Sequence, residues 1–297
     1  MTTDTDAVQP PSSEGAAARS ALPWIRLFYW SVRRELWEHR AIYLAPLVVA
    51  GLALIGFLFG TVRLPHAVRI GMTPAGHEKA FQAIAAPYEF VAFAVLLTGL
   101  AVAVLYCLGA LYGERRDRSI LFWKSLPVSD LTTVLAKAAV PMLVQPVVLF
   151  AVIIVAQLIM LALSLVVVAG AGLDVGAFAA HTPVWRLVTY LIEGLPFIGV
   201  WYAPLYAWLL LVSACARRTP SLWALAAPLV LGLVERLALG THFFWHWLGL
   251  RLVGPFAGMA GKGRDIGWTS PHVWIGLALA AAFLAAAIWL RRSREPI

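Results

Sequence analysis

The stretch GERRDRSILFWKSLPVSDLTTVLAK, residues 113–137, is a long polar interruption in an otherwise apolar chain. It lies between two apolar runs, residues 90–112 and 138–171. Each run is long enough to cross a bilayer core of about 30 Å at roughly 1.5 Å per residue. The sequence therefore predicts a polar loop between two membrane spans.

A short amphipathic helix is predicted within this loop. Its body is residues 120–124, and Pro127 ends it. Ser129 or Asp130 can cap the next helix, which continues into the following span. Four consecutive large apolar side chains in a water-facing loop suggest a surface that docks a partner. The headgroup layer of a membrane could also accommodate them, because Trp and Phe beside basic residues are common there.

The loop resembles the one between the second and third spans of ABC-2 type transporter permeases, the transmembrane subunits of bacterial ABC exporters. The matching residues are Glu114, Ser119, Leu121, Leu126, Pro127, Ser129 and Lys137. Arg118 departs from a frequent glycine, and Asp130 from a frequent basic residue. The resemblance implies a coupling helix that docks in a cleft of a separate ATPase subunit. It implies contacts by Glu114, Arg115, Arg118, Ser119, Ile120, Leu121, Phe122, Trp123, Lys124, Leu126, Pro127 and Ser129.

Composition places the chain among polytopic membrane proteins of the all-α class. Hydrophobic residues make up 61% of its 297 residues, charged residues only 13%, and the mean hydropathy is +0.82, which excludes an ordinary soluble domain. The 13 Trp and 8 Tyr suit a chain with many membrane–water crossings. The net charge of +8 is interpreted as membrane topology, and no nucleic-acid partner is expected.

Residues 1–23 are predicted to form a disordered cytoplasmic tail, because they are polar and lack the apolar core of a secretory signal. An amphipathic helix is predicted over residues 24–40, with Arg26, Arg33 and Arg40 on the side opposite its apolar face. ABC-2 permeases carry a similar elbow helix at the membrane surface, and an ordinary cytoplasmic helix is the alternative. The expected membrane-interface residues are Trp24, Phe28, Trp30 and Trp37.

Six membrane spans are predicted within a transmembrane domain of residues 24–291, followed by a cytoplasmic tail of residues 292–297. The spans are residues 41–60, 90–112, 138–171, 194–216, 222–239 and 273–290. The third is long, and Pro141 and Pro146 are its expected kinks. With the N-terminus inside, 15 of the 23 Lys and Arg residues lie on the inner side. Both termini are therefore expected in the cytoplasm, and the protein in the bacterial inner membrane.

Residues 240–272, between spans five and six, are apolar and aromatic but interrupted by glycine and proline. They are expected to form either a re-entrant helix, as in related permeases, or an interfacial one. His242 and His246 could share a helix face and hold a metal, but no third ligand is evident and no metal site is predicted. Candidate residues of a transport pathway, with packing roles as the alternative, are Gln145, Gln157, Glu235 and Arg236.

No nucleotide-binding motif is present. The nearest string, residues 261–263, lacks the earlier glycine and the following Ser or Thr of a P-loop. ATP and magnesium are therefore expected in a partner ATPase, and this chain is expected to bind no cofactor and to catalyse no reaction. The predicted function is the permease subunit of an ABC exporter, paired with itself or a paralogue. The alternative is a membrane scaffold or sensor that recruits a cytoplasmic partner through the 113–137 loop.

Overall fold

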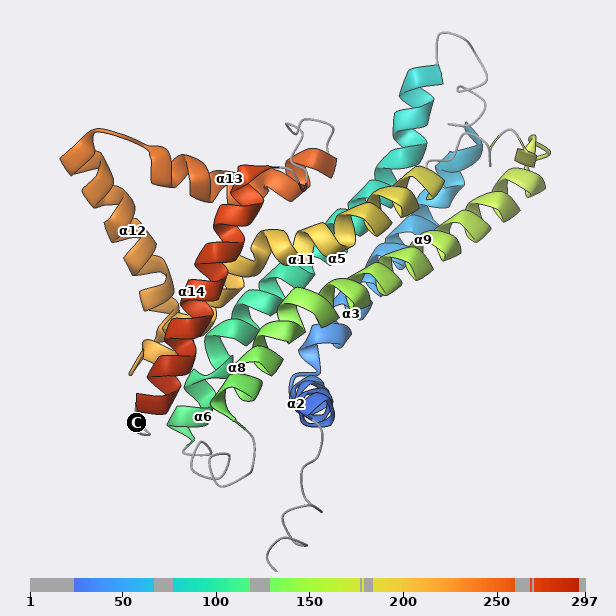
Figure 1. Ribbon diagram of the computed structural model, residues 1–297. Helices are drawn as coiled ribbons and strands as arrows, with labels where there is room; N and C mark the ends of the chain where they lie inside the picture. The colour runs from blue at the N-terminus through green and yellow to red at the C-terminus, as the bar shows by residue number, and fades with distance from the viewer. Residues whose placement is uncertain are drawn as a thin grey trace, which may run out of the picture.

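The computed structural model describes residues 24–66, 77–117, 129–176, 178, 184–259, 268 and 270–293 (Figure 1). Every regular element among these residues is helical. In chain order the helices are α2 Trp24–Glu38, α3 Ala41–Gly60, the 3₁₀ turn η1 Thr61–Arg63, α5 His77–Ala110, α6 Tyr112–Arg116, α8 Asp130–Ala139, the π-helical η2 Val140–Val144, α9 Gln145–Gly170, α11 Val184–Cys215, α12 Pro220–Leu239, α13 Phe243–Met259 and α14 Pro271–Ser293.

Six of these helical stretches are long and apolar enough to cross a bilayer, which confirms the predicted multi-pass membrane architecture. They are Ala41–Gly60, Ile84–Arg116, Asp130–Gly170, Phe197–Cys215, Pro220–Leu239 and Pro271–Ser293. The second and third extend further toward the polar loop than hydropathy suggested. The reason is that charged residues near these helix ends pair inside the protein and do not require water.

The centre of the bundle is α11, which packs against α14, α5 and α9 (Figure 1). Its aromatic side chains Trp201, Tyr202 and Tyr206 are almost completely buried. The outer surfaces of α3 and α12 carry many exposed Leu, Ile and Val side chains. A bundle that is apolar outside as well as inside suits immersion in lipid.

The third span is interrupted by the π-helical segment η2, at the two prolines expected to kink it. Pro146 has no N–H group, so the carbonyl of Met142 loses its usual donor four residues later. That carbonyl faces Gly199 of α11, where a Cβ atom would collide with it. Gln145 closes the same region by donating from Nε2 to the Gly99 carbonyl at 2.6 Å. The backbones of the third span and α11 therefore approach closely at this level, and Gln145 links the third span to α5.

The helix α12 diverges from the bundle, and α13 returns across it toward α14 (Figure 1). The turn between them is fixed by Glu235, whose carboxylate accepts hydrogen bonds from the Thr241 hydroxyl at 2.7 Å and from the backbone N–H groups of Phe243 and Phe244 at 2.8 and 2.9 Å. A carboxylate at the start of a helix satisfies its free N–H groups. Gly240, with a left-handed φ of 65°, ends α12.

Arg251 fastens α13 to the bundle. Its side chain is buried, with Nη1 donating to the Trp201 carbonyl at 2.8 Å and Nη2 donating to the His272 carbonyl. The guanidinium carbon also lies 4.5 Å from the ring centroid of Trp201 and 5.2 Å from that of Trp247. Residues 240–272 thus contain a helix, as expected, and it is tied to α11 and α14.

Candidate functional site

Four helices meet at the end of the bundle that is lowest in Figure 1: α2, α6, α8 and the last turn of α14. In sequence, α6 and α8 flank residues 118–128, the central part of the predicted coupling loop, which lie outside the described residues. The side chains at this junction form a buried ion-pair network.

Lys137 of α8 occupies the centre of the network. Its side chain is 2% exposed, and its Nζ lies 2.7 Å from Oε1 of Glu35 and 3.1 Å from Oε1 of Glu114. Glu35 comes from α2 and is 1% exposed, and Glu114 comes from α6. One ammonium group therefore joins the two helices that flank the loop to α2, which is about 100 residues away in sequence.

Arg291 in the last turn of α14 extends the network to the sixth span. Its Nη1 donates to Oε2 of Glu114 at 2.6 Å, and its Nε donates to Oδ1 of Asp130 at 2.9 Å. Asp130 is the first residue of α8, and Ser129 caps that helix by accepting a hydrogen bond from the Thr132 backbone N–H, as the sequence predicted. The two residues that flank the loop in this network, Glu114 and Asp130, are thus held by the same arginine.

The buried charges of the network are paired with opposite charges. Three carboxylates at the junction face three cations: Glu35, Glu114 and Asp130 with Arg34, Lys137 and Arg291. A fourth carboxylate, the half-exposed Glu38, pairs with Arg34 at the edge of the network at 3.4 Å. Removal of one member of a buried pair typically costs about 3–5 kcal/mol, because the other charge is left uncompensated. Exposed pairs contribute about 0–1 kcal/mol by comparison. The relative position of the four helices is therefore sensitive to the buried charges of the network, which are Glu35, Glu114, Lys137 and Arg291.

Glu35 is the most enclosed carboxylate of the network. Besides Lys137, it accepts hydrogen bonds from Arg34 at 2.9 Å and from the Tyr106 hydroxyl of α5 at 3.0 Å. Burial alone would raise the pKa of this carboxyl group, but the charges of and hydrogen bonds from Lys137 and Arg34 outweigh burial and lower the pKa. Glu35 is therefore ionised at neutral pH.

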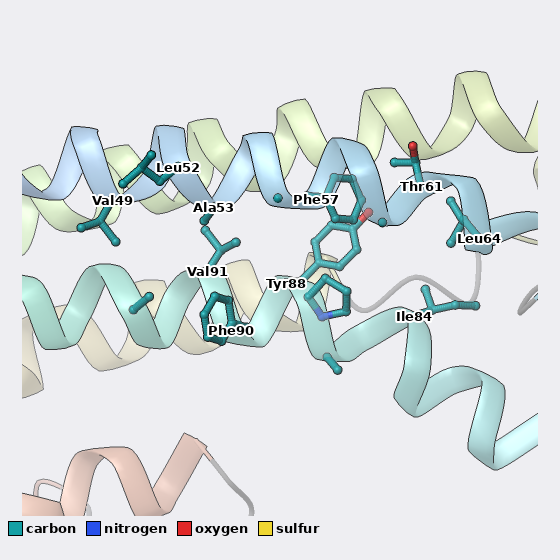
Figure 2. A pocket seen from close by; sticks show the side chains of 15 residues that line it. Val49, Leu52, Ala53, Phe57, Thr61, Leu64, Ile84, Tyr88, Phe90 and Val91 are labelled. Atoms are coloured by element: carbon teal, nitrogen blue, oxygen red, sulfur yellow. The ribbon is translucent and has the colours of Figure 1, made fainter.

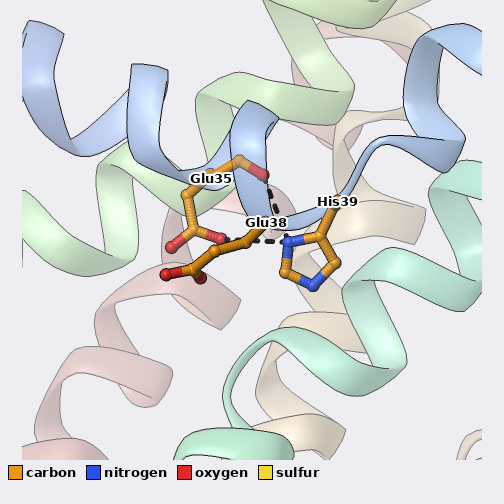
Figure 3. Close-up of side chains that lie close together, drawn as sticks. All are labelled: Glu35, Glu38 and His39. Carbon is orange, nitrogen blue, oxygen red and sulfur yellow. Dashed lines mark hydrogen bonds and ion pairs between the residues drawn. The ribbon is translucent and has the colours of Figure 1, made fainter.

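One group of three possible metal ligands occurs in the described part of the chain: Glu35, Glu38 and His39, whose ligand atoms lie within 4.8 Å of one another (Figure 3). Both Glu35 oxygens already face Lys137, Arg34 and Tyr106, and the His39 ring Nδ1 contacts the Glu35 carbonyl at 3.2 Å. A metal would have to displace these partners. The group is better explained as part of the ion-pair network.

Some of the residues expected to contact an ATPase are described, and their contacts are within the chain. Glu114 belongs to the network, and Ser129 caps α8. Arg115 is buried and donates from Nη1 to the carbonyls of Ala214 and Ala216, at 2.6 and 3.2 Å, at the end of α11. The other expected contact residues lie outside the described residues: Arg118, Ser119, Ile120, Leu121, Phe122, Trp123, Lys124, Leu126 and Pro127.

The amphipathic helix predicted near the N-terminus is present as α2. Of its expected interface residues, Trp24, Trp30 and Trp37 are exposed and Phe28 is half-buried. The guanidinium of Arg33 lies over the rings of Trp30 and Trp37, 4.9 and 5.1 Å from their centroids. This face combines aromatic and basic groups that suit a membrane surface.

The four candidate pathway residues do not form one site. Gln145 is committed to the Gly99 carbonyl in the π-helical region, and Glu235 to the α12–α13 turn. Arg236 is exposed in the last turn of α12. Gln157 is fully buried in α9, and neither of its amide atoms has a hydrogen-bond partner among the described residues.

Sequence reasoning missed Glu35 and Arg291 as members of a site. The signal for Glu35 was available: it lies three residues after Val32 in the apolar stripe of α2, a position where an acidic side chain requires a buried partner. Arg291 was counted only as an inner-side charge. Its pairing with Glu114 spans 177 positions and depends on the fold.

Comparison of the chain with protein-family models, curated proteins and solved structures gives no match.

Proposed function

We propose that this chain is the permease subunit of an ATP-driven exporter and couples to a separate ATPase subunit through the loop of residues 113–137. The observation that carries the proposal is the buried ion-pair network, which joins both flanks of that loop to α2 and α14. The resemblance of the loop to the coupling helix of ABC-2 permeases supplies the kind of partner.

The network provides a mechanical route from the loop to the spans. A partner that displaces the loop pulls on α6 and α8, which carry Glu114, Asp130 and Lys137. These residues are bound to Arg291 of α14 and to Glu35 of α2, so the sixth span and the amphipathic helix must follow or the ion pairs must break. Arg115 adds a link from α6 to the end of α11, the central span.

In this proposal α2 lies along the inner surface of the bacterial cytoplasmic membrane, and both termini are cytoplasmic. The exposed Trp24, Trp30 and Trp37 side chains face the headgroups. Two permease chains, identical or paralogous, enclose the transport path and carry two ATPase subunits. ATP and magnesium are bound by those subunits.

Affinity purification from native membranes in mild detergent tests the proposal. An ATPase is expected to co-purify with the wild-type chain, and the double substitution Phe122→Ala with Trp123→Ala is expected to weaken this association by about 100-fold or more. Full burial of each large apolar side chain contributes roughly 1.5–3 kcal/mol, and about 1.4 kcal/mol corresponds to tenfold in affinity.

The matched control is Trp289→Ala, an exposed tryptophan in α14 that lies outside the loop. Its complex should be recovered as well as that of the wild type. Undiminished recovery of the ATPase with the loop variant would mean that Phe122 and Trp123 serve the lipid interface, and the coupling role of the loop would have to be abandoned.

A further inference from the structure

Arginine and tryptophan alternate along one face of α2. The alternating residues are Arg26, Trp30, Arg33 and Trp37. They are separated by four, three and four positions, so at about 100° per residue they lie within an arc of about 60°. Glu35, the buried carboxylate that holds Lys137, lies nearly opposite the middle of that arc. The four residues, which we call the arginine–tryptophan stripe, therefore face away from the bundle.

The stripe presents positive charge at the surface. Both of its tryptophans are more than half exposed, and Arg26 is exposed as well. Arg33 lies over both indole rings, a contact that holds a guanidinium group in place without using its N–H donors. The acidic residues of α2 do not neutralise this charge, because Glu35 is buried and Glu38 pairs with Arg34 at 3.4 Å. The two arginines of the stripe can therefore donate to an anion.

The position of α2 brings the stripe to the membrane surface. Figure 1 looks along the axis of α2, whereas α3 and α9 run across the view, so α2 lies crosswise to these spans. Only His39 and Arg40 separate α2 from the first span, which begins at Ala41. Three peptide steps reach at most about 10 Å, and the headgroup layer on each side of a bilayer is roughly 5–8 Å thick. A crosswise helix about 10 Å wide on so short a connection lies against that layer.

The apolar groove beside the first span has no comparable chemistry. It lies between α3 and α5, with side chains such as Leu52, Phe57 and Phe90 in its walls (Figure 2). None of its lining residues is charged. Its walls therefore cannot select one lipid headgroup over another, whereas the stripe of α2 combines the basic and aromatic groups that do so.

We propose that the arginine–tryptophan stripe binds the headgroup phosphates of anionic phospholipids and enriches these lipids beside α2. A zwitterionic headgroup brings an ammonium group along with its phosphate, and the arginines repel that group. An anionic headgroup such as phosphatidylglycerol brings the phosphate alone. The proposal rests on the placement of α2 at the membrane surface in the proposed function, and does not depend on an ATPase. Lipid bound on this face anchors the helix whose opposite face holds Lys137 through Glu35.

Lipid quenching in the full chain tests the stripe. Tyr29 is 58% exposed next to the stripe, so Tyr29→Cys can carry a fluorophore in a chain that also has Cys215→Ser, while Cys107 is buried. The labelled chain is reconstituted into vesicles of phosphatidylcholine and phosphatidylglycerol, with brominated acyl chains on one lipid or the other. Phosphatidylglycerol should quench the fluorophore more strongly than its share of the lipid predicts. Each arginine near an anionic surface contributes roughly fivefold, so Arg26→Gln with Arg33→Gln should lower the preference by roughly 25-fold.

Two variants serve as controls. Arg217→Gln with Arg218→Gln removes the same charge from exposed positions between α11 and α12, and should keep the wild-type preference. Arg26→Lys with Arg33→Lys keeps both positive charges of the stripe and should also prefer phosphatidylglycerol. If the Arg217 and Arg218 variant loses as much preference as the glutamine variant of the stripe, the net charge of the protein attracts the lipid and the proposal is wrong.

Two other results would overturn the proposal, and they differ in what they mean for the proposed function. Equal quenching by the two brominated lipids would place α2 in the headgroup layer without a preference, so that only this proposal fails. No quenching by either lipid would remove α2 from the membrane surface, and its placement in the proposed function would fail as well. Co-purification of the ATPase tests the rest of that function separately. A preference for phosphatidylglycerol that only the glutamine variant of the stripe loses supports the site.

Discussion

Replacing Lys137 by methionine should destabilise the protein strongly, because it removes the cation between two buried carboxylates. Glu35 and Glu114 are 1% and 10% exposed, and neither can regain water without movement of a helix. Breaking a buried pair costs about 3–5 kcal/mol. Glu35 keeps Arg34 and Tyr106, and Glu114 keeps Arg291, so we expect about 3 kcal/mol, the lower end of that range.

Thermal unfolding in detergent, followed by tryptophan fluorescence, measures this effect. At about 2–4 °C per kcal/mol, Lys137→Met should lower the melting temperature by about 6–12 °C. The control Arg116→Met removes an exposed pair with Asp117, whose side chains are 66% and 62% exposed, and should change it by about 2 °C or less.

A double-mutant cycle separates the charge effect from lost packing. Glu35→Gln keeps an acceptor for the Tyr106 hydroxyl while removing the charge, so Lys137→Met combined with Glu35→Gln removes one charge of each sign. The double variant should be more stable than the sum of the single losses predicts, by about 0.5–3 kcal/mol. Losses that simply add, or a Lys137→Met variant that melts with the wild type, would refute the buried network.

Three further predictions concern pH, helix packing and the α13 helix. Since the pKa of Glu35 is lowered from its ordinary value of 4.5, the contribution of Glu35 to stability is present above about pH 4.5 and is lost as the pH falls through the lowered value. Melting temperatures measured at decreasing pH should show this loss in the wild type. A Glu35→Gln variant that shows the same loss would contradict the prediction. Gly199→Ala should lower the free energy of unfolding by more than about 1 kcal/mol, seen as a lower melting temperature, because the new methyl group meets the Met142 carbonyl. The control Gly109→Ala, whose methyl group meets nothing within 4 Å, should be neutral or slightly stabilising. Arg251→Met should lower the free energy of unfolding by about 2–4 kcal/mol, because it removes the hydrogen-bond donors to two carbonyls, and should speed amide hydrogen exchange in α13. The control Arg236→Met, at an exposed position, should leave the exchange rate unchanged.

The architecture of this chain could be predicted because apolar runs of about 20 residues have one stable form in a bilayer. The first span was predicted with the bounds it has in the structure, and the two prolines in the third span marked the π-helical interruption. Hydropathy placed the loop-side ends of the second and third spans at residues 112 and 138, short of the helical stretches that end at Arg116 and begin at Asp130. The cap at Ser129 or Asp130 did predict where the helix leading into the third span begins. The apolar runs end next to the charged residues Glu114 and Lys137. The helices nevertheless include both residues, because the two side chains pair with each other inside the protein.

The candidate site was harder to predict because its members come from four separate parts of the sequence. The loop pattern indicated Glu114 and Lys137 but did not explain their spacing in the sequence. The structure explains it, because the two side chains form an ion pair with each other within the network. Glu235 was interpreted as a possible pathway residue, whereas its carboxylate holds the start of α13. Glu235 reaches the start of α13 from inside α12, eight residues earlier, so the capping rule for the residue directly before a helix does not predict this contact.

The native mass of the particle purified from membranes in mild detergent tests the proposed function most directly. The account predicts two permease chains, either this chain of 32.3 kDa twice or once with a paralogue, with two ATPase subunits attached and magnesium-dependent hydrolysis of ATP by the particle. A particle that contains this chain at 32.3 kDa alone, or paired chains with no ATPase, would contradict the account.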